Sequence, residues 1–208
     1  GQGSRLGREK YAEMIAGKSL IERAVSLLSS LSTEILIVIS QRQSRASFSY
    51  PETKTVVDLY PRKGSLGGIY TGLMRSTCFH NLVVACDMPF LNPDLLRYMI
   101  ELSPDFDTVI PRVGKHMEPL HAIYSKNCLD PMEKLLSQGE LKITKIFDSV
   151  RVRYLEENEL DRFDPEHLSF FNINTQADLK KAKILAQRVS TRSSHATREP
   201  GEIRSKQE

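Results

Sequence analysis

The chain has 208 residues, of which 40% are hydrophobic and 26% charged, with a net charge of +3. This length and balance predict a globular domain with its own core, and so slight a charge does not indicate nucleic-acid binding. No apolar run approaches the roughly 20 residues that a membrane span needs, and the polar, glycine-rich start lacks the apolar stretch of a signal peptide. We therefore expect no nucleic-acid partner and no membrane partner.

The cysteines indicate the compartment. Cys78, Cys86 and Cys128 form no C-x-x-C pair, which argues against a zinc site and against a disulfide framework. The five histidines are scattered through the sequence and show no metal-ligand spacing. A reducing cytosol suits this composition best, so we expect a cytoplasmic protein.

The first half of the chain alternates helical and extended patterns. Ser19 and Glu22 have the spacing of a capping box, and apolar residues follow at helical intervals up to Leu31. The expected elements are, in chain order, a helix from Leu20, a continuous β-branched strand at 34–40, a shorter strand at 55–58, a glycine-rich turn at 64–68 and a helix at 69–75.

The second half continues the alternation. A buried strand at 81–87 ends on an acid, and Asn92, Pro93 and Asp94 supply the cap, the first-turn proline and the first-turn acid of a helix. Further elements are expected as strands at 107–112 and 121–125, a helix at 131–137 ending at Gly139, strands at 150–155 and 169–172, and a helix capped by Thr175 and Asp178 that runs to about Val189.

This order of elements predicts a single α/β domain over residues 1–189 with a mostly parallel sheet. Residues 190–208 are rich in Ser, Thr, Arg, Glu and Lys and offer almost nothing to bury, so we expect a disordered tail. In parallel sheets ligands bind at the carboxyl ends of the strands, where acids and glycines that follow strands become candidates for a site.

The first candidate is the segment G-Q-G-S-R-L-G-R-E-K at residues 1–10. Its glycines let backbone N–H groups turn toward an anion, and Arg5 and Lys10 add full positive charge suited to phosphate. The segment lacks the G-x-x-x-x-G-K-[ST] spacing of a P-loop. Taken alone it is equally well interpreted as a flexible, charged terminus.

Two acids and a glycine-rich turn form the next candidates. Asp87 follows a buried strand, where a carboxylate can hold Mg²⁺ against a triphosphate, and Asp58 has a similar but weaker placement. The turn at 64–68 precedes a helix, whose N-terminal N–H groups favour anions or polar base edges. A turn acid and a tight strand-to-helix connection are the plainer interpretations.

Polar residues near the end of the pattern are weaker candidates. Asn172 and Asn174 alternate in an extended segment and so point the same way, toward a polar ring or simply toward the next helix cap. His121 stands at the start of a strand, where it is either a structural histidine or a substrate contact.

Taken together and in order, these motifs resemble the molybdenum cofactor guanylyltransferases, a branch of the sugar-nucleotide-type transferases. Arg5 and Lys10 look like the arginine and lysine of that family's L-A-G-G-x-S-x-R-M-G-x-D-K loop, and Gly1 looks like the second glycine of its pair. Asp87 looks like the magnesium-binding aspartate. The segments at 64–68, 119–124 and 172–175 resemble its G-P-L-x-G, P-L-H-A-x-Y and N-x-N-T motifs, with Ser65 where proline is usual and Glu9 where aspartate is usual.

The resemblance implies a three-layer α/β/α fold of the nucleotide-diphospho-sugar-transferase type, which is Rossmann-like. It also implies that a terminal phosphate of molybdopterin-bound molybdenum attacks the α-phosphate of GTP and releases pyrophosphate. The implied catalytic residues are Arg5, Lys10 and Asp87, with Mg²⁺ on Asp87. The residues implied in nucleotide binding are Gly1, Gly3, Lys10, Ser40, Asp58, Gly64, Leu66, Gly67 and Asp87, and those implied to face the pterin are His121, Asn172 and Asn174.

Two alternatives stay open. A cytidylyltransferase for the same cofactor, or another nucleotidyltransferase of this fold, differs in its base, and the motifs at 64–68 and 86–89 resemble the GTP-using branch more closely. The second alternative is a non-catalytic protein that delivers the cofactor to apo-molybdoenzymes or works with other biosynthetic proteins. Lys10, Asp58 and Asp87 argue against the second.

The start of the chain departs from the family's pattern. The family's loop follows a strand, and this sequence begins at Gly1 within the loop. We therefore expect the sequence as given to lack the family's first strand, to bind GTP poorly and to be only marginally stable. Roughly six to ten apolar residues placed ahead of Gly1, about one strand's length, should recover both GTP binding and stability.

Overall fold

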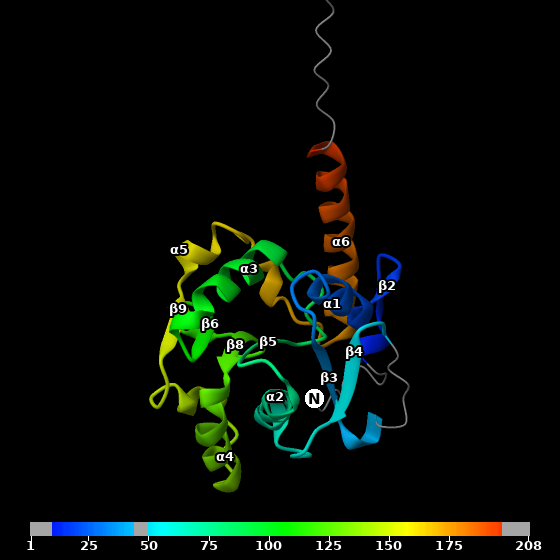
Figure 1. Cartoon of the computed structure of the whole chain (residues 1–208). Helices are drawn as coiled ribbons and strands as arrows, with labels where there is room; N and C mark the ends of the chain where they lie inside the picture. The colour runs from blue at the N-terminus through cyan, green and yellow to red at the C-terminus, as the bar shows by residue number, and fades with distance from the viewer. Residues whose placement is uncertain (1–9, 44–49, 197–208) are drawn as a thin grey trace, which may run out of the picture.

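The computed structural model describes residues 10–43 and 50–196, with only the backbone described for Arg42 and for residues 189–196. Its strands form a small sheet and a larger one, and helices cover both (Figure 1). A short hairpin of β1 (Met14–Ile15) and β2 (Lys18–Ser19) precedes them.

The small sheet pairs β3 (Ile35–Ile39) with β4 (Thr53–Val57) in parallel. Successive residues of a strand point to opposite faces, and alternate residues of β3 are buried. On one face β3 packs against Ile21 and Val25 of α1 (Leu20–Leu28). On the other face α2 (Gly64–Arg75) approaches so closely that a Cβ at Gly72 would lie 3.6 Å from Val38. The small sheet therefore lies between two helices.

The larger sheet has the strand order β5–β8–β6–β7, with β9 also paired to β6. Its strands are β5 (His80–Val84), β6 (Thr108–Val113), β7 (His116–Met117), β8 (His121–Ser125) and β9 (Val152–Leu155). Apolar residues of α3 (Pro93–Leu102) pack in a core with Val109 and Ile123. The opposite core joins α2 and α4 (Leu129–Ser137) to Ile110 and Tyr124. The predicted three-layer α/β/α fold is confirmed.

The sheet is mixed, however, and the prediction of a mostly parallel sheet was wrong in this respect. β8 runs antiparallel to both β5 and β6, whereas β6 and β9 are parallel. Only residues 114–120, which include β7, connect β6 to β8. A parallel return needs a crossover of a dozen or more residues, so this short connection forces β8 to run back antiparallel.

The remaining elements connect and extend these layers. They are η1 (Lys10–Ala12), η2 (Gln41–Gln43), η3 (Ser103–Asp105), η4 (Lys126–Cys128), η5 (Ile143–Ile146), α5 (Glu157–Leu160), η6 (Leu168–Phe170) and α6 (Gln176–Ala196). Buried residues of α6, such as Leu179 and Ala182, pack on Ile15 and Leu20, and the end of α6 extends away from the body (Figure 1).

The predicted helix caps are confirmed. Ser19 and Glu22 form a complete capping box, and the Asn92 side chain accepts from the N–H groups of Asp94 and Leu95. At the last helix the Thr175 hydroxyl accepts from the Asp178 N–H, and the Asp178 carboxylate accepts from the Thr175 N–H. That helix ends at Ala196 rather than near Val189, so residues 190–196 are helical; the disorder predicted for residues 197–208 falls outside the described residues.

Two local predictions were wrong. The glycine-rich segment at 64–68 is not a turn but the first part of α2, and a Cβ at Gly67 would come within 2.9 Å of the Tyr60 carbonyl oxygen. Only glycine fits that close approach. Residues 169–172 form no strand, because the Asp164 carboxylate accepts from the N–H groups of Leu168 and Ser169 and so supports the short helix η6.

Within the described residues, β3 pairs only with β4 and β5 only with β8, so no ladder joins the two sheets. The stabilising effect of a strand ahead of Gly1 stays a prediction. Among residues 10–43 and 50–196, none of the helices combines the length and the apolar character that crossing a membrane requires.

Candidate functional site

Three polar side chains that are far apart in the sequence converge beside the larger sheet. The Lys10 ammonium lies 2.8 Å from Asn174 Oδ1 and 3.4 Å from Asp87 Oδ2. Lys10 comes from η1, Asp87 from the loop after β5, and Asn174 from the segment before α6. About a fifth of the side-chain surface of Lys10 and of Asp87 remains exposed. A cation and a carboxylate are thus held close together at a place that solvent reaches.

The loop that carries Asp87 is held by several hydrogen bonds. The strand ends at Val84, three residues before Asp87, which corrects the predicted boundary. The Ile173 N–H donates to the Asp87 carbonyl at 3.0 Å, and the Arg23 guanidinium donates twice to the Pro89 carbonyl, at 3.2 and 3.1 Å. Among the described residues, the Lys10 ammonium is the only side-chain group that donates to the Asp87 carboxylate.

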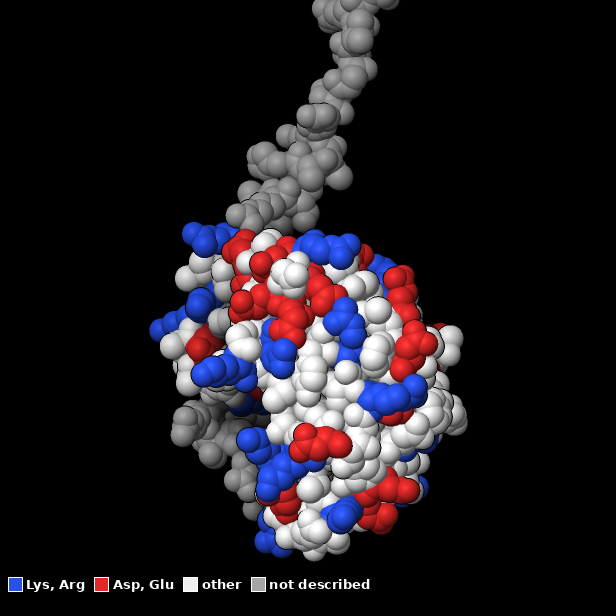
Figure 2. Space-filling view, turned by 90° about the vertical axis from the view of Figure 1, so that its left-hand side faces the viewer, with Lys and Arg blue, Asp and Glu red and all other residues white. Residues whose placement is uncertain are grey.

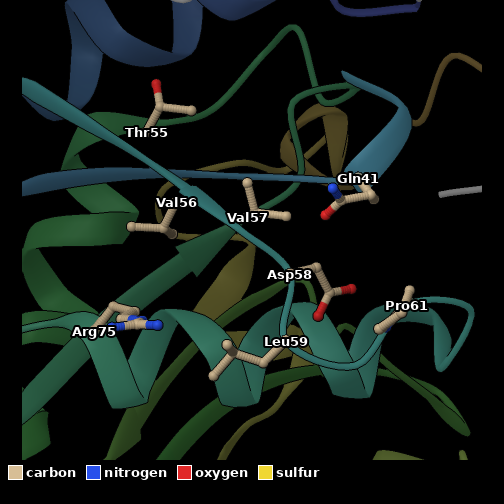
Figure 3. Close-up of a pocket in the computed structure, with 8 residues that line it drawn as sticks. All are labelled: Gln41, Thr55, Val56, Val57, Asp58, Leu59, Pro61 and Arg75. Atoms are coloured by element: carbon tan, nitrogen blue, oxygen red, sulfur yellow. The ribbon is translucent and has the colours of Figure 1, made fainter. Parts of the chain in front are cut away.

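Asp58 directly follows β4 at the carboxyl end of the small sheet. Its Oδ1 accepts from the Tyr60 N–H at 2.9 Å and from the Thr71 hydroxyl at 3.0 Å. Asp58 lines an open cavity of about 580 Å³ between β4 and α2 (Figure 3). The other lining residues are Gln41, Thr55, Val56, Val57, Leu59, Pro61 and Arg75. This space beside a fixed carboxylate is suited to a polar ring or a sugar.

The glycine-rich candidates occupy the start of α2. Gly64 has a φ of +63°, a backbone conformation that side chains rarely adopt. The side chain of Leu66 is completely buried in the core, so only its backbone is available to a ligand. These residues place N–H groups at a helix N-terminus, as the sequence indicated.

Ser40 lies at the carboxyl end of the small sheet, immediately after β3. Its hydroxyl donates to Gln43 Oε1 at 2.9 Å, and its N–H donates to the same oxygen at 3.1 Å. The predicted site residues Gly1, Gly3 and Arg5 lie outside the described residues.

His121 is completely buried in this conformation, and its implied contact with the pterin stays a prediction. Neither ring nitrogen has a hydrogen-bond partner in the described structure. The Phe170 ring packs edge-on against the imidazole, with 5.0 Å between the two ring centroids. Burial lowers the pKa of His121 to about 3, so the ring is neutral at physiological pH. Asn172 is half-buried, and its amide donates to the Phe170 carbonyl oxygen.

The donor set near Asp87 fits Mg²⁺ better than a transition metal. Among the described residues there is no group of three His, Cys, Asp or Glu side chains that could enclose a metal ion. Magnesium in nucleotide sites commonly uses one or two carboxylates together with substrate phosphates and water. Asp87 offers such a carboxylate oxygen, and Lys10 beside it could bind the same phosphates.

Sequence reasoning did not identify two features of the site. Thr71 fixes Asp58, and Gln41 lines the same cavity, yet neither lies in a motif that suggests such a role. Asn174 was expected to face the pterin but contacts Lys10. Contacts of this kind depend on how distant segments meet, which no local pattern specifies.

The face of the molecule that carries α5 and β9 has no uniform charge (Figure 2). Lys and Arg side chains are interspersed there with Asp and Glu. Several of these charges are paired near α5, as in Arg112 with Glu156 and Arg153 with Glu159.

Comparisons with known proteins match most of this chain. The model of the MobA-like NTP transferase domain matches residues 1–154. A protein of Pelotomaculum thermopropionicum named "Probable molybdenum cofactor guanylyltransferase" is 35% identical over 191 residues, covering 92% of each chain. The molybdenum cofactor guanylyltransferase of Desulfosudis oleivorans is 34% identical over 187 residues, covering 88% of this chain and 91% of that protein.

Two solved structures superpose on most of this chain. Molybdopterin-guanine dinucleotide biosynthesis protein A from Archaeoglobus fulgidus superposes with a TM-score of 0.78 at 33% identity, covering 90% of this chain and 95% of that one. A cytidylyltransferase for 2-C-methyl-D-erythritol 4-phosphate from Thermus thermophilus superposes with a TM-score of 0.64 at 14% identity, covering 86% of this chain and 94% of that one, which shows a shared fold alone.

Proposed function

Because the chain belongs to the MobA-like NTP transferase family, we propose that it transfers GMP from GTP to the molybdenum–molybdopterin cofactor. The products are the guanine dinucleotide form of the cofactor and pyrophosphate. The observation that carries this proposal is the convergence of Lys10, Asp87 and Asn174, with Asp58 at the carboxyl end of the neighbouring sheet.

Transfer of this kind depends mainly on charge neutralisation and in-line positioning. The terminal phosphate of molybdopterin forms a bond to the α-phosphorus of GTP, and the bond from that phosphorus to the bridging oxygen of the β-phosphate breaks. Lys10, together with Arg5 from the N-terminal segment, neutralises the triphosphate. Asp87 would hold Mg²⁺, which when bound would supply charge stabilisation for the pyrophosphate that leaves.

The nucleoside end of GTP is assigned to the small sheet. Asp58 accepts hydrogen bonds from ribose or base in the cavity between β4 and α2, and Gly1, Gly3, Ser40, Gly64, Leu66 and Gly67 contribute through backbone or hydroxyl groups. The Asp58 Oδ1 is already occupied by two donors, so Oδ2 is the oxygen available to the nucleotide. His121 has no exposed surface in this conformation, so its contact with the pterin requires movement of the Phe170 region.

The test of this proposal is an Asp87→Asn variant with Asp94→Asn as its matched control. Asp94 is an exposed carboxylate seven positions along the chain, paired with Arg97 on the surface of α3. Pyrophosphate release from GTP, Mg²⁺ and molybdopterin-bound molybdenum should stop with Asp87→Asn and continue with Asp94→Asn, while circular dichroism shows both folded. Near-normal turnover by Asp87→Asn would eliminate the metal assignment.

Two alternatives have distinct signatures. A cytidylyltransferase turns over CTP in place of GTP, and a cofactor-delivery protein binds GTP with Mg²⁺ but releases no pyrophosphate. The names of the curated relatives favour the guanylyltransferase. Delivery to apo-molybdoenzymes, cooperation with other biosynthetic proteins and a cytoplasmic location remain predictions.

A further inference from the structure

Asn174 does not contact the same kind of group as the other asparagine of its motif. Asn172 donates to the Phe170 carbonyl within its own segment, whereas Asn174 Oδ1 accepts from the Lys10 ammonium at 2.8 Å, across 164 positions of sequence. The Lys10–Asn174 contact is also shorter than the 3.4 Å contact between Lys10 and Asp87. The motif therefore reaches the phosphate-binding side of the site.

The backbone around Asn174 is fixed on both sides. Ile173 is completely buried, and its N–H donates to the Asp87 carbonyl oxygen at 3.0 Å. The N–H of Asn174 itself donates to the Asp178 carboxylate at 3.0 Å, within the cap of α6. An exposed amide on such a fixed backbone can hold a flexible lysine side chain in one direction.

A neutral amide suits this role because it orients the ammonium without cancelling its charge. Lys carries three N–H donors, of which Asn174 takes one. The contact with Asp87, at 3.4 Å, is longer than a charge-assisted hydrogen bond usually is. The N–H groups that Asn174 does not take are therefore available to a triphosphate.

We infer that Asn174 is a positioning residue for GTP, acting through the Lys10 ammonium rather than through the pterin. This inference rests on the proposed role of Lys10 in binding the triphosphate. It places the last motif of the sequence on the nucleotide side of the reaction and assigns Asn174 a part in GTP affinity.

The experiment is a double-mutant cycle of Lys10→Met and Asn174→Ala in the full chain, read out as the Kd for GTP with Mg²⁺ and as both KM values. Asn174→Ala should raise the Kd and the KM for GTP about tenfold, the effect of roughly one charge-assisted hydrogen bond, with the KM for the molybdopterin substrate unchanged. In the Lys10→Met background the same change should have little further effect.

Asn174→Asp, which keeps the hydrogen bond but cancels the charge, should also weaken GTP binding. Asn81→Ala, which alters an asparagine of β5 whose side-chain amide donates to the Cys78 and Phe79 carbonyl oxygens, serves as the control and should change neither KM.

The outcomes separate the positioning role of Asn174 from the proposed role of Lys10 in GTP binding. If Lys10→Met weakens GTP binding but Asn174→Ala does not, or if the two effects add, the positioning role is wrong and the proposed role of Lys10 stands. A higher KM for molybdopterin alone would return Asn174 to the pterin side. If Lys10→Met leaves the Kd for GTP unchanged, the proposed role of Lys10 fails and the positioning role fails with it.

Discussion

A strand of the larger sheet and a strand of the small one differ in how far they are buried, yet each sheet presents one acid of the proposed site. All five residues of β8, in the larger sheet, are buried, whereas β4 in the small sheet has Lys54 and Thr55 exposed. Asp87 follows the larger sheet and Asp58 the small one, and within the described residues no ladder joins the two sheets. The proposed site therefore depends on how the two sheets are held together by contacts other than strand pairing.

The largest expected effect separates the two acids. Asp87→Asn should lower kcat by a factor of about 10² to 10³, because it removes the carboxylate that we assign to Mg²⁺. Asp58→Asn should lower kcat/KM for GTP only about tenfold and mainly through KM, because it weakens a hydrogen bond to the nucleoside. Steady-state pyrophosphate release measures both. Equal losses in kcat would contradict the division of roles between the sheets.

The next effect is on the stability of the larger sheet. Asp107 is buried and accepts from the Ser125 hydroxyl, the Asn127 amide and the N–H and guanidinium of Arg151. Asp107→Asn should lower the free energy of unfolding by about 2 kcal/mol, because an amide cannot accept from all these donors and leaves some unpaired. Urea unfolding monitored by circular dichroism gives the value. A loss below about 0.5 kcal/mol would show that this cluster contributes little.

Acid should weaken both sheets in the same pH range. Burial raises the pKa of Asp107 more than any single hydrogen bond lowers it, but the hydrogen bonds from Arg151, Asn127 and Ser125 together bring that pKa down to about 2. Hydrogen bonds to Glu34, chiefly from the backbone of Thr77, also lower its pKa to about 2. Each carboxyl thus binds its proton more tightly in the unfolded chain, so the stability that they contribute is present above about pH 5 and is lost as pH falls toward 2. Thermal melts between pH 6 and 2.5 should show this fall, and it should be shallower in Asp107→Asn. An unchanged slope in that variant would remove Asp107 as a cause.

The smallest effect concerns the small sheet. Glu34, just before β3, accepts from the Ser76 hydroxyl and from the N–H and hydroxyl of Thr77, and it pairs with Lys54 of β4. Glu34→Gln should cost about 1 kcal/mol, since some hydrogen bonds survive in the amide. Hydrogen exchange should show faster opening of β3 and β4 with β8 unaffected. Uniformly faster exchange would mean that the two sheets unfold as one unit.

The sequence predicted much of the fold because its signals are local. The capping residues Ser19, Asn92 and Thr175 mark helix starts through bonds to neighbours within a few positions, and the β-branched run at 35–39 identifies a buried strand. The antiparallel course of β8 was missed because it depends on the short connection after β6, and the alternating pattern of a strand carries no direction.

The candidate site residues likewise differ in whether a local sequence signal or a non-local contact determines their positions. The positions of Asp58 and Asp87 after strands could be predicted because strands are recognisable locally, whereas their roles in the site stay proposals. The burial of His121 beneath Phe170, and the contact of Asn174 with Lys10, depend on how distant segments pack. Local spacing cannot specify such contacts, so neither could be predicted from the sequence.

The most direct test of the account is the stoichiometry of the reaction catalysed by the full chain. With GTP, Mg²⁺ and molybdopterin-bound molybdenum, we predict one pyrophosphate and one guanine dinucleotide product for each GTP consumed, measured by coupled assay and mass spectrometry. Pyrophosphate should not form when the molybdopterin substrate is omitted, and CTP should turn over far more slowly. GTP binding without pyrophosphate release, or a preference for CTP, would contradict the proposed guanylyl transfer.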